Sequence, residues 1–95
     1  MFSKNIIKKS LNELSEMQIR QMKNKGCLPE NKEEVILHLV EEVGELCECI
    51  REKKGNKRVK EEVADILWQL NKFCWINNFD LEKIFLKKLN KNKKR

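Results

Sequence analysis

The chain has 95 residues and a mass of 11.4 kDa, so we expect a single domain over residues 1–95. Charged residues form 38% of it, no apolar run approaches the roughly 20 residues of a membrane span, and lysines interrupt the N-terminal apolar residues, which predicts a soluble, cytoplasmic protein. The net charge of +6 is carried entirely by the last nine residues, so the rest of the chain does not indicate nucleic acid as a partner.

Turn-forming residues are rare, with three glycines and one proline, and the sequence predicts an all-α protein. The predicted helices span residues 3–25, 31–52, 57–76 and 80–90, with Ser3, Asn31 and Asp80 as side-chain caps. Their short connections favour an antiparallel four-helix bundle. Since so short a chain hides only about 60–65% of its unfolded surface, we expect self-association to complete the bundle.

The second and third predicted helices carry the same pattern of acids beside an apolar arc. Glu42 and Glu45 lie at the edge of the first arc on a helical wheel. Glu62 and Asp65 lie at the same edge of the second arc. Antiparallel helices that pack through these arcs are related by an approximate two-fold axis, which keeps matching edges on the same side. The four acids are therefore predicted to converge into one carboxylate cluster.

Such converging carboxylates repel one another at neutral pH unless protons or cations compensate their charge. Oxygen ligands without imidazole or thiolate suit a hard divalent cation, so Mg²⁺ is the expected cofactor, with Mn²⁺ as a substitute. Because Mg²⁺ also binds phosphates, the cluster predicts hydrolytic phosphoryl or nucleotidyl transfer. The alternative is that acids three residues apart merely line a solvated helix face.

Two acidic segments, residues 41–46 (EEVGEL) and 61–67 (EEVADIL), carry a further signal, and Lys88 and Asn92 follow in the last predicted helix. The segments match EExxE and ExxD signatures and the last pair matches a KxxxN element, so residues 33–95 resemble the MazG-like, all-α nucleoside triphosphate pyrophosphohydrolases. The resemblance implies a helical dimer or tetramer that binds Mg²⁺. It also implies cleavage of a nucleotide between its α and β phosphates, which releases a monophosphate and pyrophosphate.

The resemblance assigns roles to individual residues. The implied metal ligands are Glu42, Glu45, Glu62 and Asp65. Glu41 matches the first acid of EExxE and either orients the attacking water or faces solvent, so the catalytic candidates are Glu41, Glu42 and Lys88. Lys88 and Asn92 match residues that contact phosphates in relatives, and Lys88 would assist the leaving pyrophosphate. The alternative for both is a solvated basic tail.

The base pocket departs from that of the dCTP-cleaving relatives. Their aromatic residues are replaced here by residues 26–28 (GCL) and 49–52 (CIRE), so an aromatic sandwich at these places is missing. Gln69 lies one turn after the second acidic motif, where relatives often have a tyrosine, and His38 lies one turn before the first. Both are candidate substrate-binding residues, although a partly exposed helix histidine without a role is as common.

Trp68 and Trp75 form a second apolar stripe on the third predicted helix, away from its main arc. A helix buried on one side only would leave both indoles in water. We therefore predict that the tryptophans contribute to a subunit interface, with base stacking as the alternative.

The main interpretation is a Mg²⁺-dependent nucleotide pyrophosphohydrolase that removes unwanted nucleotides from the cellular pool. One alternative is an enzyme like phosphoribosyl-ATP pyrophosphohydrolase, which would share the acids but act on a different substrate. The other is a non-enzymatic helical module that binds nucleic acid or regulates a partner through the basic C-terminal tail.

Overall fold

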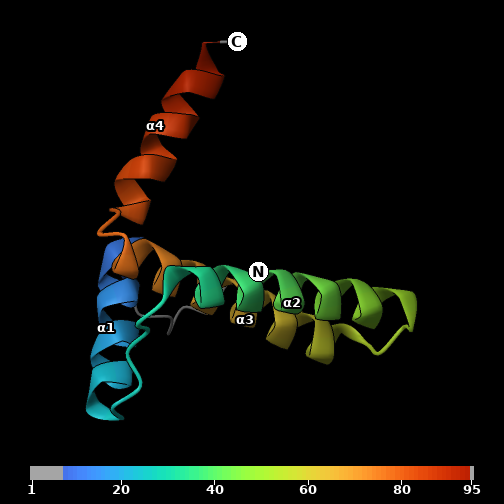
Figure 1. Cartoon of the computed structure of the whole chain (residues 1–95). Helices are drawn as coiled ribbons and strands as arrows, with labels where there is room; N and C mark the ends of the chain where they lie inside the picture. Colours follow the sequence, from blue (N-terminus) through green and yellow to red (C-terminus); the bar gives the residue numbers. More distant parts are fainter. Residues whose placement is uncertain (1–7, 95) are drawn as a thin grey trace.

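In the computed structural model, which describes residues 8–94, the chain forms four helices: α1 (Leu11–Asn24), α2 (Lys32–Arg51), α3 (Asn56–Ile76) and α4 (Leu81–Lys93) (Figure 1). No strand occurs between residues 8 and 94, and the all-α fold with four helices is confirmed. Helices α2 and α3 run antiparallel and side by side, while α1 crosses one end of this pair. Helix α4 extends away from α2 and α3, so the single chain forms an open bundle.

The first helix begins later than the sequence predicts. The backbone amide of Glu13 donates to the Ser10 hydroxyl, and the amide of Ser10 donates to the Glu13 carboxylate, each at 3.1 Å. This capping box satisfies two amides that a helix start would otherwise leave free. It begins α1 at Leu11, so the prediction of a helix through residues 8–10 is wrong. The predicted cap Ser3 lies outside the described residues.

The boundaries of α2 and α3 agree with the predicted ones to within about one residue. The side chain of Asn31 caps α2 by accepting hydrogen bonds from the backbone amides of Glu33 and Glu34. The turn to α3 places Lys53 at φ 54° and Gly55 at φ 94°. Glycine takes such a conformation without the strain that a Cβ atom would add, which explains the tight reversal before α3.

A buried polar network joins α1 to α3. The side-chain amide of Gln18 donates to the backbone carbonyl of Trp68 at 2.9 Å. Its side-chain oxygen accepts from the side-chain amide of Asn71 at 3.0 Å. The Ser15 hydroxyl donates to the Asn71 side-chain oxygen at 3.0 Å. Gln18 and Asn71 are buried, so each needs these partners to offset the cost of its desolvation. The network therefore fixes how α1 packs on α3.

Helix α4 is attached to the rest of the chain at its first turn. Asp80 caps it by accepting from the Lys83 amide at 3.0 Å, as predicted, and the same carboxylate accepts from the Asn12 side chain at 2.8 Å. The Asn12 side-chain oxygen accepts in turn from the Glu82 amide at 3.4 Å. Beyond this anchor the helix continues to Lys93 rather than ending near Asn90, and none of its residues is buried.

The apolar core of the single chain is small. Its buried apolar side chains are Met22, Val35, Cys49 and Cys74. Larger apolar side chains on every helix are exposed, among them Leu14, Val40, Leu67 and Phe85. None of the described helices combines the length and the apolar character needed to cross a membrane.

Candidate metal centre

Helices α2 and α3 contact each other through one stripe of side chains on each helix. Residues within a stripe are three or four positions apart, and all of them are buried or half-buried. The α2 stripe is Val35, Leu39, Glu42, Leu46 and Cys49. The α3 stripe is Val59, Glu62, Ile66, Gln69 and Phe73. This spacing keeps the side chains of a stripe on one face of each helix. One acid from each helix therefore lies in the middle of the α2–α3 contact.

The central position of these acids corrects the prediction that the helices pack through their apolar arcs with the acids at the edge of the contact. Glu62 is only 1% exposed, whereas Val43 and Val63, the apolar neighbours of the two acids, are exposed. The physical reason is that each apolar arc is wider than the strip that one packed helix covers. The α2–α3 contact uses the side of the arc that contains the acids, and the remainder of the arc faces outward.

Three of the four predicted ligands come together. One carboxylate oxygen each from Glu42, Glu62 and Asp65 lies within 4.8 Å of the others. The fourth, Glu45, is exposed and stands outside this group, although its charge acts on Glu42. Glu41 is also exposed. We call Glu42, Glu62 and Asp65 the carboxylate cluster.

The electrostatics of the carboxylate cluster show that the negative charge around Glu42 is poorly compensated. Burial, followed by hydrogen bonding with Glu62 and by the negative charges of Glu45, Asp65 and Glu62, raises the pKa of Glu42 to about 7. One oxygen of Glu42 and one of Glu62, the Oε2 atom in each case, are buried without a hydrogen-bond partner. Buried carboxylate oxygens without a donor are costly in a folded protein. The cluster therefore has both the charge and the free oxygen atoms to accept a cation.

The donor set indicates which cation fits. All three members of the carboxylate cluster supply oxygen, and neither imidazole nor thiolate belongs to the group. Hard divalent cations prefer such ligands, and Mg²⁺ commonly takes one or two carboxylates and fills its other positions with water and substrate phosphates. The residues present therefore fit Mg²⁺, or Mn²⁺ in its place.

Comparison with known families gives a clear match. The profile of the MazG nucleotide pyrophosphohydrolase domain matches residues 30–95, which contain α2, α3 and α4. The chain belongs to the MazG family. The predicted resemblance is thus confirmed, and membership identifies nucleotides as the class of substrate and hydrolysis of an acid anhydride as the class of reaction. Comparison with curated proteins and with solved structures gives no significant match.

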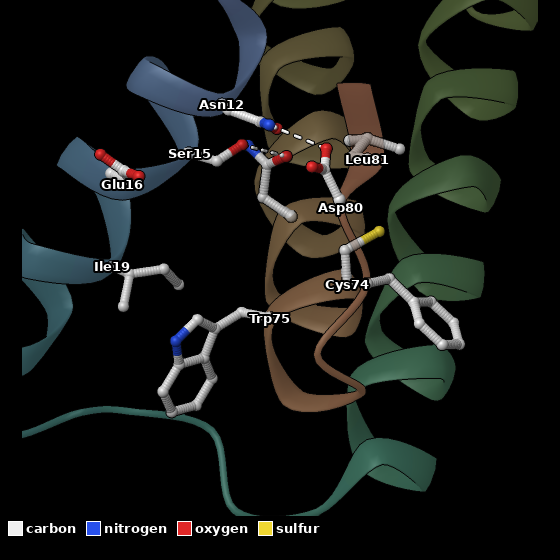
Figure 2. A pocket seen from close by; sticks show the side chains of 10 residues that line it. Asn12, Ser15, Glu16, Ile19, Cys74, Trp75, Asp80 and Leu81 are labelled. Carbon is white, nitrogen blue, oxygen red and sulfur yellow. Dashed lines mark hydrogen bonds between the residues drawn. The ribbon is translucent and has the colours of Figure 1, made fainter. Parts of the chain in front are cut away.

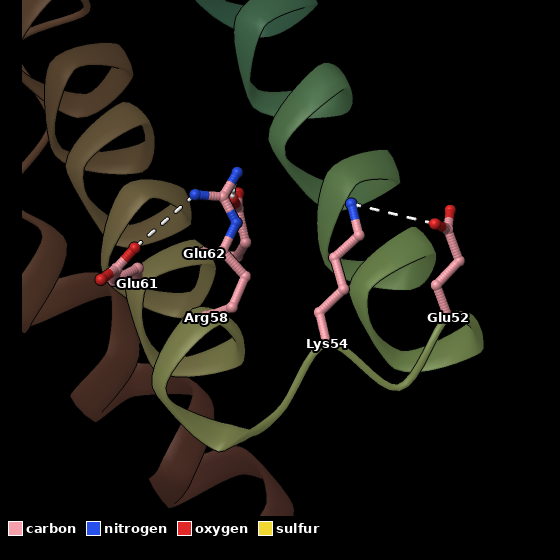
Figure 3. A network of polar contacts seen from close by, with 5 residues as sticks. All are labelled: Glu52, Lys54, Arg58, Glu61 and Glu62. Carbon is pink, nitrogen blue, oxygen red and sulfur yellow. Dashed lines mark ion pairs between the residues drawn. The ribbon is translucent and has the colours of Figure 1, made fainter.

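A positively charged side chain, Arg58, lies beside the MazG acids, and the sequence interpretation does not include it. The Arg58 guanidinium lies 3.1 Å from the Glu62 carboxylate and 3.6 Å from that of Glu61 (Figure 3). Arg58 precedes Glu62 by four residues on α3, a spacing at which oppositely charged side chains meet on a helix. This spacing is the sequence signal that identifies Arg58 as part of the site. Its guanidinium partly neutralises Glu62 and would compete with a metal ion.

Replacement of Arg58 by glutamine is expected to strengthen Mn²⁺ or Mg²⁺ binding by roughly 3- to 10-fold, because one positive charge near the site no longer repels the cation. Calorimetric titration of the metal into the purified protein measures this. Lys60→Gln, which removes a charge from an exposed position of the same helix, should have a smaller effect. Weaker metal binding in Arg58→Gln would show instead that the ion pair organises the carboxylates.

The remaining MazG candidates are placed unequally. Gln69 lies in the α3 stripe, and its Oε1 atom is buried without a hydrogen-bond partner, so it can accept a bond from a ligand. His38 is exposed on α2. Lys88 and Asn92 are exposed on α4, the helix that extends away from the α2–α3 pair (Figure 1). A single chain therefore does not bring Lys88 and Asn92 to the carboxylate cluster.

The two tryptophans lie on the side of α3 that α1 partly covers. Trp75 lines a cavity of about 200 Å³ together with Ile19 and Ser15 of α1 and Asp80 before α4 (Figure 2). Binding sites for small molecules usually measure about 300–1,000 Å³, so this cavity is too small for a nucleotide. Trp68 and Trp75 remain 37% and 42% exposed. Their predicted role in a subunit interface stays a prediction.

Proposed function

We propose that this protein is a Mg²⁺-dependent pyrophosphohydrolase that cleaves a nucleoside or deoxynucleoside triphosphate to the monophosphate and pyrophosphate. Family membership supports the reaction class. The observation that carries the proposal is the carboxylate cluster, in which carboxylate oxygens of Glu42 and Glu62 are buried without partners. Such a site is costly in the protein alone and suits a bound cation and the phosphates that it attracts.

The residues present define how the site would work. Glu42, Glu62 and Asp65 would hold the cation, and Glu45 would join them as a fourth ligand. A bound Mg²⁺ would neutralise the negative charge that develops on the phosphate oxygens. Glu41, beside Glu42 on the exposed side of α2, would orient the attacking water.

Substrate recognition is proposed to involve residues next to the carboxylate cluster. The free Oε1 atom of Gln69 would accept a hydrogen bond from an amino or imino group of the base. His38, exposed one turn before Glu42, would contact the sugar or the phosphates. Removal of unwanted nucleotides from the cellular pool is the physiological role that fits this chemistry.

Pyrophosphate release from a panel of canonical and modified triphosphates, with phosphoribosyl-ATP included, tests the proposal. We expect release from at least one nucleoside triphosphate with Mg²⁺ or Mn²⁺, none with EDTA, and loss of release in Glu42→Gln. Pyrophosphate release from phosphoribosyl-ATP and from no other substrate would identify the protein instead as an enzyme like phosphoribosyl-ATP pyrophosphohydrolase of histidine synthesis. If no substrate yields pyrophosphate under any metal, the proposed function is wrong.

A further inference from the structure

Arg58 forms the ion pair that joins the carboxylate cluster to a basic side chain. Its guanidinium lies 3.1 Å from the carboxylate of Glu62, which is almost fully buried, while the Arg58 side chain is 51% exposed (Figure 3). Within residues 8–94, no other lysine or arginine forms an ion pair with a cluster acid. Lys88 lies on α4, the helix that extends away from the α2–α3 pair. Arg58 is therefore the cation of the described chain that lies where the cluster meets solvent.

Four polar residues of α3 form a row along one face of the helix. They follow one another at spacings of four, three and four residues and are Arg58, Glu62, Asp65 and Gln69. The two cluster acids lie in the middle of the row, with Arg58 toward the start of α3 and Gln69 toward its end. At about 1.5 Å per residue, Arg58 and Gln69 lie roughly 16 Å apart along the helix axis, about the length of an extended nucleoside triphosphate. A nucleotide whose base contacts Gln69 would therefore place its terminal phosphates near Arg58.

The position of Arg58 is not one that stabilises α3 itself. Arg58 lies in the first turn of the helix, where the helix dipole favours acids over bases. Helices α1, α2 and α4 each have an acid in the first turn, whereas α3 has none. An arginine four residues before a glutamate also stabilises a helix less than the reverse order does. What Arg58 does in the protein alone is to lower the cost of the buried charge of Glu62, a task that a bound cation would take over.

A divalent cation in the carboxylate cluster would change the charges that act on Arg58. The cation would neutralise Glu62 and repel the guanidinium, so the attraction between Arg58 and Glu62 would weaken. A triphosphate bound at the same place brings new negative charge. The planar guanidinium can donate two parallel hydrogen bonds to a phosphate as well as to a carboxylate. Since the Arg58 side chain is long and half exposed, it can turn from one partner to the other without a change in α3.

We propose that Arg58 is a phosphate-binding residue, which pairs with Glu62 in the metal-free protein and with the terminal phosphates of the nucleotide once a cation occupies the carboxylate cluster. This inference rests on the proposed function and adds the direction of the substrate, with its base toward Gln69 and its terminal phosphates toward Arg58. These phosphates leave as pyrophosphate, which keeps the electron pair of the broken bond. The guanidinium offsets the negative charge that accumulates on this leaving group.

Binding measurements without catalysis test this assignment. Arg58→Gln is titrated first with Mn²⁺ alone and then, with Mn²⁺ bound, with a nucleoside triphosphate whose bridging oxygen between the α and β phosphates is replaced by a methylene group. We expect Mn²⁺ to bind about 3- to 10-fold more tightly than in the natural chain, and the nucleotide at least about 10-fold more weakly. Arg58→Lys, which keeps the charge but not the planar fork, should bind the nucleotide with intermediate affinity. A purely structural role of Arg58 would not produce two effects of opposite sign.

Shorter ligands and a matched variant locate the contact. Inorganic pyrophosphate should lose affinity for the Mn²⁺ form of Arg58→Gln as the triphosphate does, whereas a nucleoside monophosphate, which lacks the terminal phosphates, should bind within about 2-fold of its natural affinity. Lys60→Gln removes a charge from an exposed position of the same helix and should change the binding of the triphosphate by less than about 2-fold. An equal loss of affinity for the monophosphate and the triphosphate in Arg58→Gln would overturn the inferred direction of the nucleotide.

The inference fails if Arg58→Gln binds the triphosphate as tightly as the natural chain, if it binds Mn²⁺ and the triphosphate both more weakly, or if the natural chain with Mn²⁺ binds neither the triphosphate nor pyrophosphate. Turnover by the natural chain separates this result from the proposed function. A chain that releases no pyrophosphate from any nucleotide, but binds pyrophosphate in an Arg58-dependent way, contradicts the proposed function and supports the role of Arg58. Pyrophosphate release with equal nucleotide affinity in both chains overturns the role of Arg58 and leaves the enzyme.

Discussion

Replacement of Glu62 by glutamine is expected to lower pyrophosphate release by about 100- to 1,000-fold, the size of effect seen when one preorganised group is removed from an electrostatic catalytic site. Glu62 is 1% exposed and lies within 4.8 Å of Glu42 and Asp65, so water cannot substitute for its missing charge. The amide retains the shape of the side chain but removes its negative charge, which lowers its affinity for a cation. Steady-state kinetics at saturating Mg²⁺, together with Mn²⁺ titration of the free protein, measures both consequences.

Glu61 provides a matched control for this experiment. It precedes Glu62 in the sequence, contacts the same Arg58, and is exposed. Glu61→Gln therefore removes an acid from the same ion-pair network without altering the carboxylate cluster, and its rate should stay within about 2-fold of the natural one. Full activity and metal binding in Glu62→Gln would show that the carboxylate cluster is not the metal centre.

Without metal, the free energy of unfolding is expected to decrease as pH rises from about 4.5 to about 7. Glu42 has an ordinary pKa of 4.5 and a pKa of about 7 in the folded chain, so in this interval the folded state binds more protons than the unfolded state. Stability then falls with increasing pH. Below this interval the carboxyl is protonated in both states, and above it ionised in both, so Glu42 adds no further slope. Urea denaturation at several pH values in EDTA measures the effect.

Two comparisons identify the group responsible. Glu42→Gln should show a flatter dependence of stability on pH over the same interval, because its amide does not titrate. In the natural chain, Mg²⁺ at pH 8 should raise the melting temperature more than at pH 5, since the cation binds ionised carboxylates and competes with protons. An unchanged slope in Glu42→Gln would assign the pH dependence to another group.

The local structure of α2 and α3 could be predicted from the sequence because local signals dominate there. Asn31 caps α2, Gly55 reverses the chain, and the acids recur at matching positions of the two helices. Two helices joined by a short turn have few ways to pack, so the convergence of acids from both helices follows from their order along the chain. The family motifs identified the same residues independently.

Three other features, the start of α1, the burial of Glu62 and the direction of α4, depend on a choice between alternative caps or packing faces. A helical wheel does not decide between such alternatives. Both Ser3 and Ser10 could start the first helix, and only Ser10 has a glutamate three residues later that returns its hydrogen bond. Each apolar arc is wider than the strip that a neighbouring helix covers, so either side of the arc could form the α2–α3 contact. The burial of Glu62 therefore could not be predicted from the sequence. Within residues 8–94 no residue of α4 is buried, so the direction of α4 could not be derived from the packing of its apolar side chains.

The hydrogen bonds of α1 have a consequence for the direction of α4. A helix held only by apolar contacts can rotate or shift by a turn at little cost, but such a shift in α1 would leave the Gln18 and Asn71 amides without partners. Asn12, on the same helix, holds the carboxylate of Asp80 at the first turn of α4. The Gln18 bonds thus fix the orientation of α1 on α3, and the Asn12–Asp80 bond fixes the start of α4 on α1. Polar contacts near the middle of α1 therefore influence where the far end of the 13-residue helix α4 points.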